Sequence, residues 1–192
     1  MTRTNIAVES EVADSLSDEA SRENKTLYAL ANEALKTVLK VRREGGSIDD
    51  IYTAWIYARI SGDLDIVPIP ANLLEKMVKT LYVEQKESLL KAWYDEGSRI
   101  GTYLRVSFPK IAELAPEVAQ LSRARLLPVK RVEIRPKEGE AGRTVVRVVG
   151  AGLSEESTRC AEQFVRGLIS AYSLKITEGS VSEGIIEIKV AG

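Results

Sequence analysis

Arg3-Thr4-Asn5-Ile6-Ala7-Val8, close to the start of this 192-residue sequence, alternates polar and apolar side chains. A period of two is typical of a short β-strand with one face in water. Two amphipathic segments follow, from Glu9 to Glu23 and from Thr26 to Glu44, with Asn24-Lys25 between them. The N-terminal segment therefore predicts one strand followed by two helices.

Both predicted helices carry an apolar stripe and a polar residue suited to cap the N-terminus, Ser10 in the first and Thr26 in the second. Gly45-Gly46 is expected to end the second helix. The second stripe is wide enough to cover a partner helix as well as the first helix. The stripes consist of Val12, Leu16 and Ala20 in the first helix, and of Leu27, Leu30, Ala31, Ala34, Leu35, Val38, Leu39 and Val41 in the second.

This order and spacing of elements resembles the ribbon-helix-helix DNA-binding family. The resemblance implies an intertwined homodimer, in which two chains each supply one strand of an antiparallel ribbon that enters the major groove. The outward side chains of the ribbon would be Arg3, Asn5 and Ala7. Arginine can bind guanine, asparagine can bind adenine and alanine can contact the thymine methyl group, so these three residues are the predicted base readers.

The family also docks the N-terminus of its second helix on a DNA phosphate. The matching positions here are Lys25, Thr26 and Leu27. A helix N-terminus attracts anions because its backbone N–H groups and its dipole both favour negative charge. The alternative interpretation of the same pattern is an ordinary helical hairpin preceded by a disordered arm.

The composition argues against an enzyme. The sequence has no histidine and a single cysteine, Cys160, which removes histidine-based triads and most zinc sites. No cofactor is expected, because Glu155 stands where the loop Gly150-Ala151-Gly152 would need the third glycine of a dinucleotide fingerprint. Cys160 is interpreted as a small core residue, with a redox role as the alternative. No intrachain disulfide can form, which favours a reducing cytoplasm.

The charge balance limits what non-specific DNA binding can contribute. The sequence has 27 Lys and Arg residues against 28 Asp and Glu residues, and a formal net charge of −1. A DNA-binding protein usually shows a basic patch, so non-specific affinity should be modest and strongly salt-dependent. No apolar run approaches the roughly 20 residues that span a bilayer, so no membrane contact is expected. The abundance of Arg, Lys and Glu hints at a heat-adapted source.

Residues 46–127 predict a helical connector or dimerisation region. Pro70 is suited to open its second helix. A third helix is expected over about Lys86 to Val106, in which Gly97 and Gly101 lie one turn apart and would let another backbone approach closely. The first helix is expected to bury a face made of Ile48, Ile51, Trp55 and Ile56, or Tyr52.

Residues 128–192 predict a β-β-α-β-β order, which implies an antiparallel sheet with a helix packed on one face. The chain is therefore expected to be α+β, with domains at 1–45, 46–127 and 128–192. The four strands are expected at Val129 to Arg135, Arg143 to Val149, Leu174 to Glu178 and Ile185 to Val190, with the helix from Ser154 through about Tyr172.

A glycine-bearing helix ahead of a hairpin, then the segment Cys160-Ala161-Glu162-Gln163-Phe164-Val165-Arg166-Gly167-Leu168 and two closing strands, resembles the vinyl-reductase-like small-molecule-binding domain. The resemblance covers about residues 89–190 and implies the sensing of a small hydrophobic effector. The cysteines that many members carry near the end are missing between Val181 and Ile188, so no metal site is expected. A generic α+β dimerisation domain is the alternative.

Together these patterns predict a homodimeric, cytoplasmic, sequence-specific double-stranded DNA-binding transcription regulator. We expect a repressor with a C-terminal domain for ligand sensing or assembly. The alternative is an antitoxin-like or adaptor protein that binds a partner protein through its helical or C-terminal region. An enzyme is the least favoured class.

Overall fold

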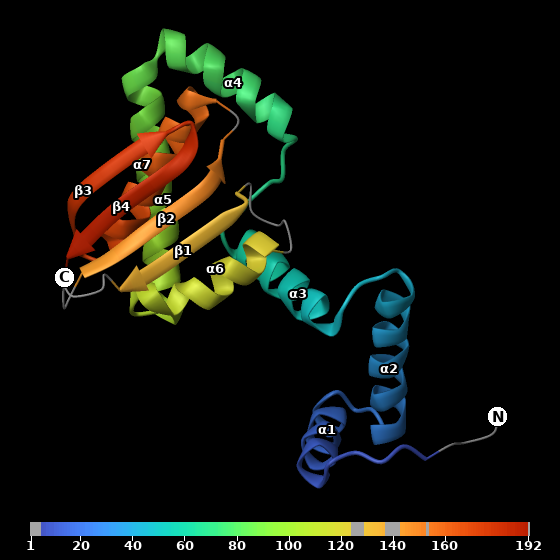
Figure 1. The fold of residues 1–192 in the computed structure, drawn as a ribbon. Helices are drawn as coiled ribbons and strands as arrows, with labels where there is room; N and C mark the ends of the chain where they lie inside the picture. The colour runs from blue at the N-terminus through green and yellow to red at the C-terminus, as the bar shows by residue number, and fades with distance from the viewer. Residues whose placement is uncertain (1–4, 124–128, 137–142, 153, 192) are drawn as a thin grey trace. The chain divides into compact units, whose positions relative to one another are not determined.

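The computed structural model describes residues 5–123, 129–136, 143–152 and 154–191 (Figure 1). The chain forms two compact units, Met1–Ala54 and Trp55–Gly192. Helices are combined with one antiparallel sheet, so the predicted α+β class is confirmed. The elements in chain order are α1 (Ser10–Arg22), α2 (Leu27–Arg43), α3 (Ile48–Asp63), α4 (Ala71–Glu84), α5 (Lys86–Ser107), the 3-10 helix η1 (Ile111–Glu113), α6 (Leu114–Arg123), β1 (Arg131–Pro136), β2 (Arg143–Ala151), α7 (Glu155–Ala171), β3 (Lys175–Ser182) and β4 (Gly184–Ala191).

Local backbone chemistry sets the turn between α1 and α2 in the first unit. Asn24 takes a left-handed conformation with φ of 54°, and the Lys25 N–H donates to the Ala20 carbonyl at 2.8 Å, which closes the end of α1. Thr26 caps α2 as predicted, because its hydroxyl oxygen accepts the Ala29 N–H at 3.1 Å.

The start of α1 and the end of α2 test two further predictions. The prediction that Ser10 is the N-cap of α1 is wrong by one residue. Glu9 holds that position with an extended backbone, and its carbonyl already accepts the Ala13 N–H at 3.0 Å. At the other end, α2 stops at Arg43 and Gly45 takes φ of 86°, as expected for a glycine that ends a helix.

Residues 5–9 have no regular secondary structure in the single chain. A strand needs a neighbouring strand to accept and donate its backbone hydrogen bonds, and a ribbon between two chains cannot form in one. Arg3 lies outside the described residues. The predicted ribbon therefore stays a prediction.

The buried face of α3 differs from the predicted one. Ile56 is buried as expected, but Ile48 and Trp55 are each 53% exposed, and Thr53 is buried instead. The guanidinium of Arg59 lies over the ring of the exposed Trp55, 5.0 Å from its centroid. A reciprocal cap begins the helix: the Asp50 N–H donates to the Ser47 hydroxyl oxygen at 3.2 Å, and the Ser47 N–H donates to Asp50 Oδ2 at 2.6 Å.

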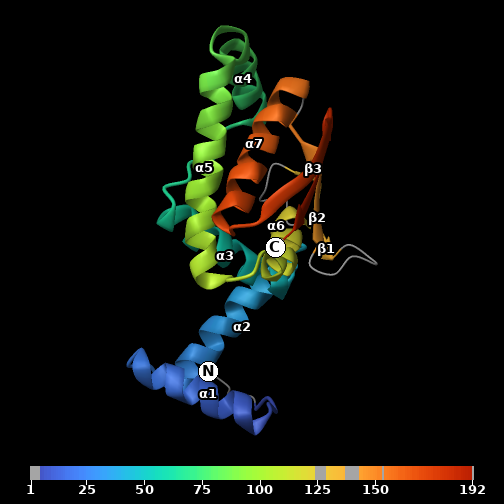
Figure 2. The same ribbon diagram turned by 90° about the vertical axis from the view of Figure 1, so that its left-hand side faces the viewer.

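The second unit is built in layers on a sheet with the strand order β1-β2-β4-β3, in which all neighbours are antiparallel. α7 covers one face of the sheet, and α5 packs along the other side of α7 (Figures 1 and 2). The core between α7 and the sheet includes Ile169, Val146, Val148, Ile186, Ile188 and Val190. Both predicted hairpins are present, but β3 extends to Ser182 rather than ending at Glu178, because its pairing with β4 continues to Ser182 opposite Ile185. The register of this pairing shifts between Ile176 and Glu178.

The contact between α5 and α7 depends on glycine. A Cβ added at Gly97 would lie 2.0 Å from the Phe164 carbonyl oxygen, and one added at Gly167 would lie 2.0 Å from the Tyr94 carbonyl oxygen. The predicted close approach at Gly97 and Gly101 is thereby confirmed, with α7 as the neighbour. We expected residues 46–127 to form a connector apart from residues 128–192, whereas α5 and α7 belong to one unit.

Candidate nucleic-acid interface

The predicted phosphate site lies at the corner between α1 and α2. Leu27 is the first residue of α2, and Thr26 holds the N-cap position with its hydroxyl already used inside the helix. The first turn of a helix presents backbone N–H groups that lack intrahelical partners, so an anion can be bound there without further side chains. The geometry of Thr26 and Leu27 is therefore compatible with a phosphate contact through the backbone.

The Lys25 ammonium is already engaged by two carboxylates. It lies 2.7 Å from Glu23 Oε2 and 2.7 Å from Glu33 Oε2. Hydrogen bonds to Glu23 and Glu33 raise the pKa of Lys25 above its ordinary value. A phosphate would have to displace these two acids, so Lys25 contributes less net attraction than a free lysine would.

Two of the predicted base readers are among the described residues. Asn5 and Ala7 are exposed, and so are Ile6 and Val8 beside them, at 68% and 63%. Neighbouring apolar side chains with this exposure can mark an interaction surface. Arg3 cannot be placed relative to them, because it lies outside the described residues.

The first unit has almost no apolar core of its own. Among residues 5–54, Ala20 is the only hydrophobic side chain that is fully buried. Domains of this size are only marginally stable even with a complete core. Large apolar side chains are exposed along both helices and the segment before them: Ile6, Val8, Val12, Leu27, Tyr28, Leu35 and Leu39.

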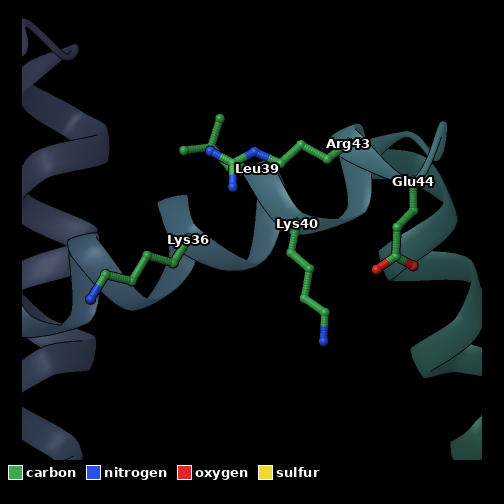
Figure 3. A pocket seen from close by; sticks show the side chains of 5 residues that line it. All are labelled: Lys36, Leu39, Lys40, Arg43 and Glu44. Atoms are coloured by element: carbon green, nitrogen blue, oxygen red, sulfur yellow. The ribbon is translucent and has the colours of Figure 1, made fainter.

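A feature that we did not assign to the site from the sequence is a row of cations on α2. Lys36, Lys40 and Arg43 border a shallow pocket together with Leu39 and Glu44 (Figure 3). Within the described part of the chain, none of these three cations forms an ion pair. The spacing at i, i+4 and i+7 was the available signal, since it places the three on one helix face.

The candidate reactive group of the second unit is the thiol of Cys160. Burial raises the pKa of the Cys160 thiol to about 11, and the side chain is fully buried, which supports the interpretation as a core residue. No group of three or more metal-ligating side chains occurs among the described residues. In the same set of residues, no helix has the length and apolar character to cross a membrane.

The start of α7, after the loop Gly150-Ala151-Gly152, is occupied by a side chain of α4. Ser154 and Ser157 form a reciprocal cap there. Burial disfavours the charged form of Glu75, but the Ser154 and Ser157 hydroxyls and the ammonium of Lys79 outweigh it, and the pKa of Glu75 lies below its ordinary value. The carboxylate of Glu75 thus lies near the N-terminus of α7, where negative charge is favoured.

Comparisons with known proteins leave the family open. No family model matches the chain, and no curated protein matches it. One solved structure, described as "Probing the function of heme distortion in the H-NOX family", has a TM-score of 0.40 and 12% sequence identity, over 65% of this chain and 72% of that chain. A TM-score of this size supports no argument about fold or function.

Proposed function

We propose that the chain is a homodimeric, sequence-specific double-stranded DNA-binding regulator, a repressor, whose first unit reads the operator. The second unit would sense a small hydrophobic effector or build larger assemblies. The observation that carries the proposal is the exposed apolar surface of the first unit, which is continuous in sequence with the alternating segment at 3–8.

A second copy is the covering surface that this pattern favours. Leu35 and Leu39 are 46% and 53% exposed, and burying such a side chain fully contributes about 1.5–3 kcal/mol relative to full exposure. Covering the half that is exposed would therefore contribute about 1 kcal/mol for each leucine in each chain. With Tyr28, Val12 and Ile6 included, the gain is large enough to matter for a unit that lacks a core.

Dimerisation would also give the N-terminal segment its missing hydrogen-bond partner. Two copies of residues 3–8, paired antiparallel, would place Ile6 and Val8 toward the helices and Arg3, Asn5 and Ala7 outward. A two-stranded ribbon fits the major groove, where each good bidentate contact discriminates bases by about 1–3 kcal/mol. The capped N-terminus of α2, at Thr26 and Leu27, would then contact a phosphate.

The test is a gel-shift titration with the DNA upstream of the gene, against unrelated competitor DNA, at two salt concentrations. We expect a competitor-resistant shift that weakens with salt. Arg3→Ala and Asn5→Ala should each reduce operator affinity by about tenfold to a hundredfold and leave the dimer intact. Lys76→Ala and Asn72→Ala, which remove an exposed cation and an exposed asparagine from α4, are the matched controls and should bind like the wild type.

Unchanged operator affinity in both reader variants would refute the ribbon. The same exposed surface could instead be covered by a different protein, as in the antitoxin-like or adaptor alternative. A stable complex with a small neighbour-encoded protein, together with no specific shift on any upstream DNA, would favour that alternative.

A further inference from the structure

The row of cations on α2, which we call the basic strip, forms no ion pair with the described residues of its own chain. Lys36, Lys40 and Arg43 are exposed and, among the described residues, not ion-paired. Figure 3 shows their side chains spread around the pocket that they share with Leu39. Cations in the last turn are favoured by the helix dipole, which accounts for Arg43 and Lys40 but not for Lys36, one turn earlier.

α1 carries the complementary pattern. Glu11, Asp14 and Asp18 occur at i, i+3 and i+7 and therefore share one helix face. All three are exposed, and none forms an ion pair with a described residue. We call this row the acidic strip. Each strip spans eight residues of helix, about 10 Å between its first and last Cα atoms, so the two match in length and are opposite in charge.

The acidic strip faces away from the α2 of its own chain. Ala20 is the buried residue of α1 and marks the side that packs on α2. Asp18 lies two positions before it, about 200° around the helix. Val12, the exposed apolar residue that a dimer would cover, is likewise about 200° from Asp14. The acidic strip therefore lies outside both the hairpin and the surface expected to close the homodimer. The basic strip borders that surface at Leu39, so its three cations flank the homodimer contact.

We infer that the basic strip of one copy docks on the acidic strip of another copy, in a contact that links neighbouring homodimers. The contact joins two different surfaces, so it is heterologous and can repeat from one dimer to the next. The inference rests on the proposed function, since it assumes the homodimer that reads DNA. Its expected consequence is cooperative occupation of adjacent operator sites at low salt.

Sedimentation velocity of the full chain at about 50 mM and about 500 mM NaCl tests the contact, because exposed ion pairs are screened over this range. We expect species larger than a dimer at low salt and a dimer at high salt. Lys36→Glu/Lys40→Glu and Asp14→Lys/Asp18→Lys should each weaken the association of dimers by about tenfold. The variant that combines all four changes should recover it to within about threefold, because the signs match again.

Lys76→Glu in α4 is the control for an added negative charge and should associate like the wild type. Three results would overturn the inference: a wild-type dimer that never associates further, reversal variants that associate normally, or a combined variant that does not recover. Loss of the homodimer itself in the reversal variants would also overturn it, because the strips would then meet inside the dimer. Operator binding is measured separately, so a specific shift with no association of dimers refutes this contact alone.

Discussion

Gly97→Ala should separate α5 from α7 and destabilise the second unit. The added Cβ would lie 2.0 Å from the Phe164 carbonyl oxygen and 2.8 Å from its carbonyl carbon, where ordinary van der Waals contact begins near 3.4 Å. The obstacle is backbone, so no side chain can rotate away and the helices must move apart by more than an ångström. Overpacking of this kind costs about 1–3 kcal/mol, and we take the upper end because a whole helix contact opens.

The alanine also brings a gain that has to be subtracted. Replacing glycine inside a helix contributes about 1 kcal/mol of helix propensity, so the expected net loss is about 2 kcal/mol in the free energy of unfolding. Gly62→Ala in α3 isolates that gain, because nothing lies within 4 Å of its added Cβ. This control should be neutral or up to about 1 kcal/mol more stable.

Urea unfolding followed by tryptophan fluorescence provides the measurement, since Trp93 lies on α5. Protein concentration must be fixed, because self-association changes apparent stability. A Gly97→Ala protein that unfolds at the wild-type urea concentration or above it would refute the close contact of the two backbones. Gly167→Ala, on the opposite side of the same contact, should reproduce the loss.

Three further predictions concern single side chains. The pKa of Glu75 is lowered, so its contribution to stability is present above the ordinary value of 4.5 and is lost as pH falls through the lower folded value. The urea midpoint of the wild type should therefore fall between about pH 5 and pH 3, and the midpoint of Glu75→Gln should fall less over the same range. Cys160 is fully buried, and its thiol pKa is raised to about 11, so Ellman's reagent should label it only in denaturant. Fast labelling of the native protein would contradict its assignment as a core residue. Thr26→Ala should destabilise α2 by about 1 kcal/mol in thermal unfolding followed by circular dichroism, whereas Thr26→Ser keeps the capping oxygen and should lose only a few tenths.

Local chemistry explains which parts of the fold the sequence predicts. The Thr26 cap, the left-handed Gly45 and the alternation in β1, β2 and β4 depend on neighbours a few residues away, and each is found within two residues of where the pattern places it. The inner face of α3 depends on which neighbours arrive from elsewhere, and there Trp55 is exposed. α6 and η1 were not predicted, although Leu114, Val118 and Leu121 lie at i, i+4 and i+7 on one face of α6.

The glycines show where sequence reasoning stops short of a contact. Their spacing in α5 indicates that some backbone comes close, since a missing side chain has no other use in a helix interior. It cannot say which backbone, because helix propensity and periodicity carry no information about distant segments. Gly167 completes the contact from α7, and only the fold reveals that the three glycines belong together.

At the candidate site, the sequence pattern predicts a structure that a single chain cannot form by itself. The alternation at 3–8 predicts a strand. A strand is stable only when it pairs with a second strand, and in the ribbon that second strand would come from another copy of the chain. Leu35 and Leu39 on α2 are likewise exposed among the described residues. In the proposed homodimer, the unpaired alternating segment and the uncovered apolar stripe would have the same cause. A second copy would satisfy both at once, because each copy would supply a strand for the other's strand and an apolar face for the other's stripe.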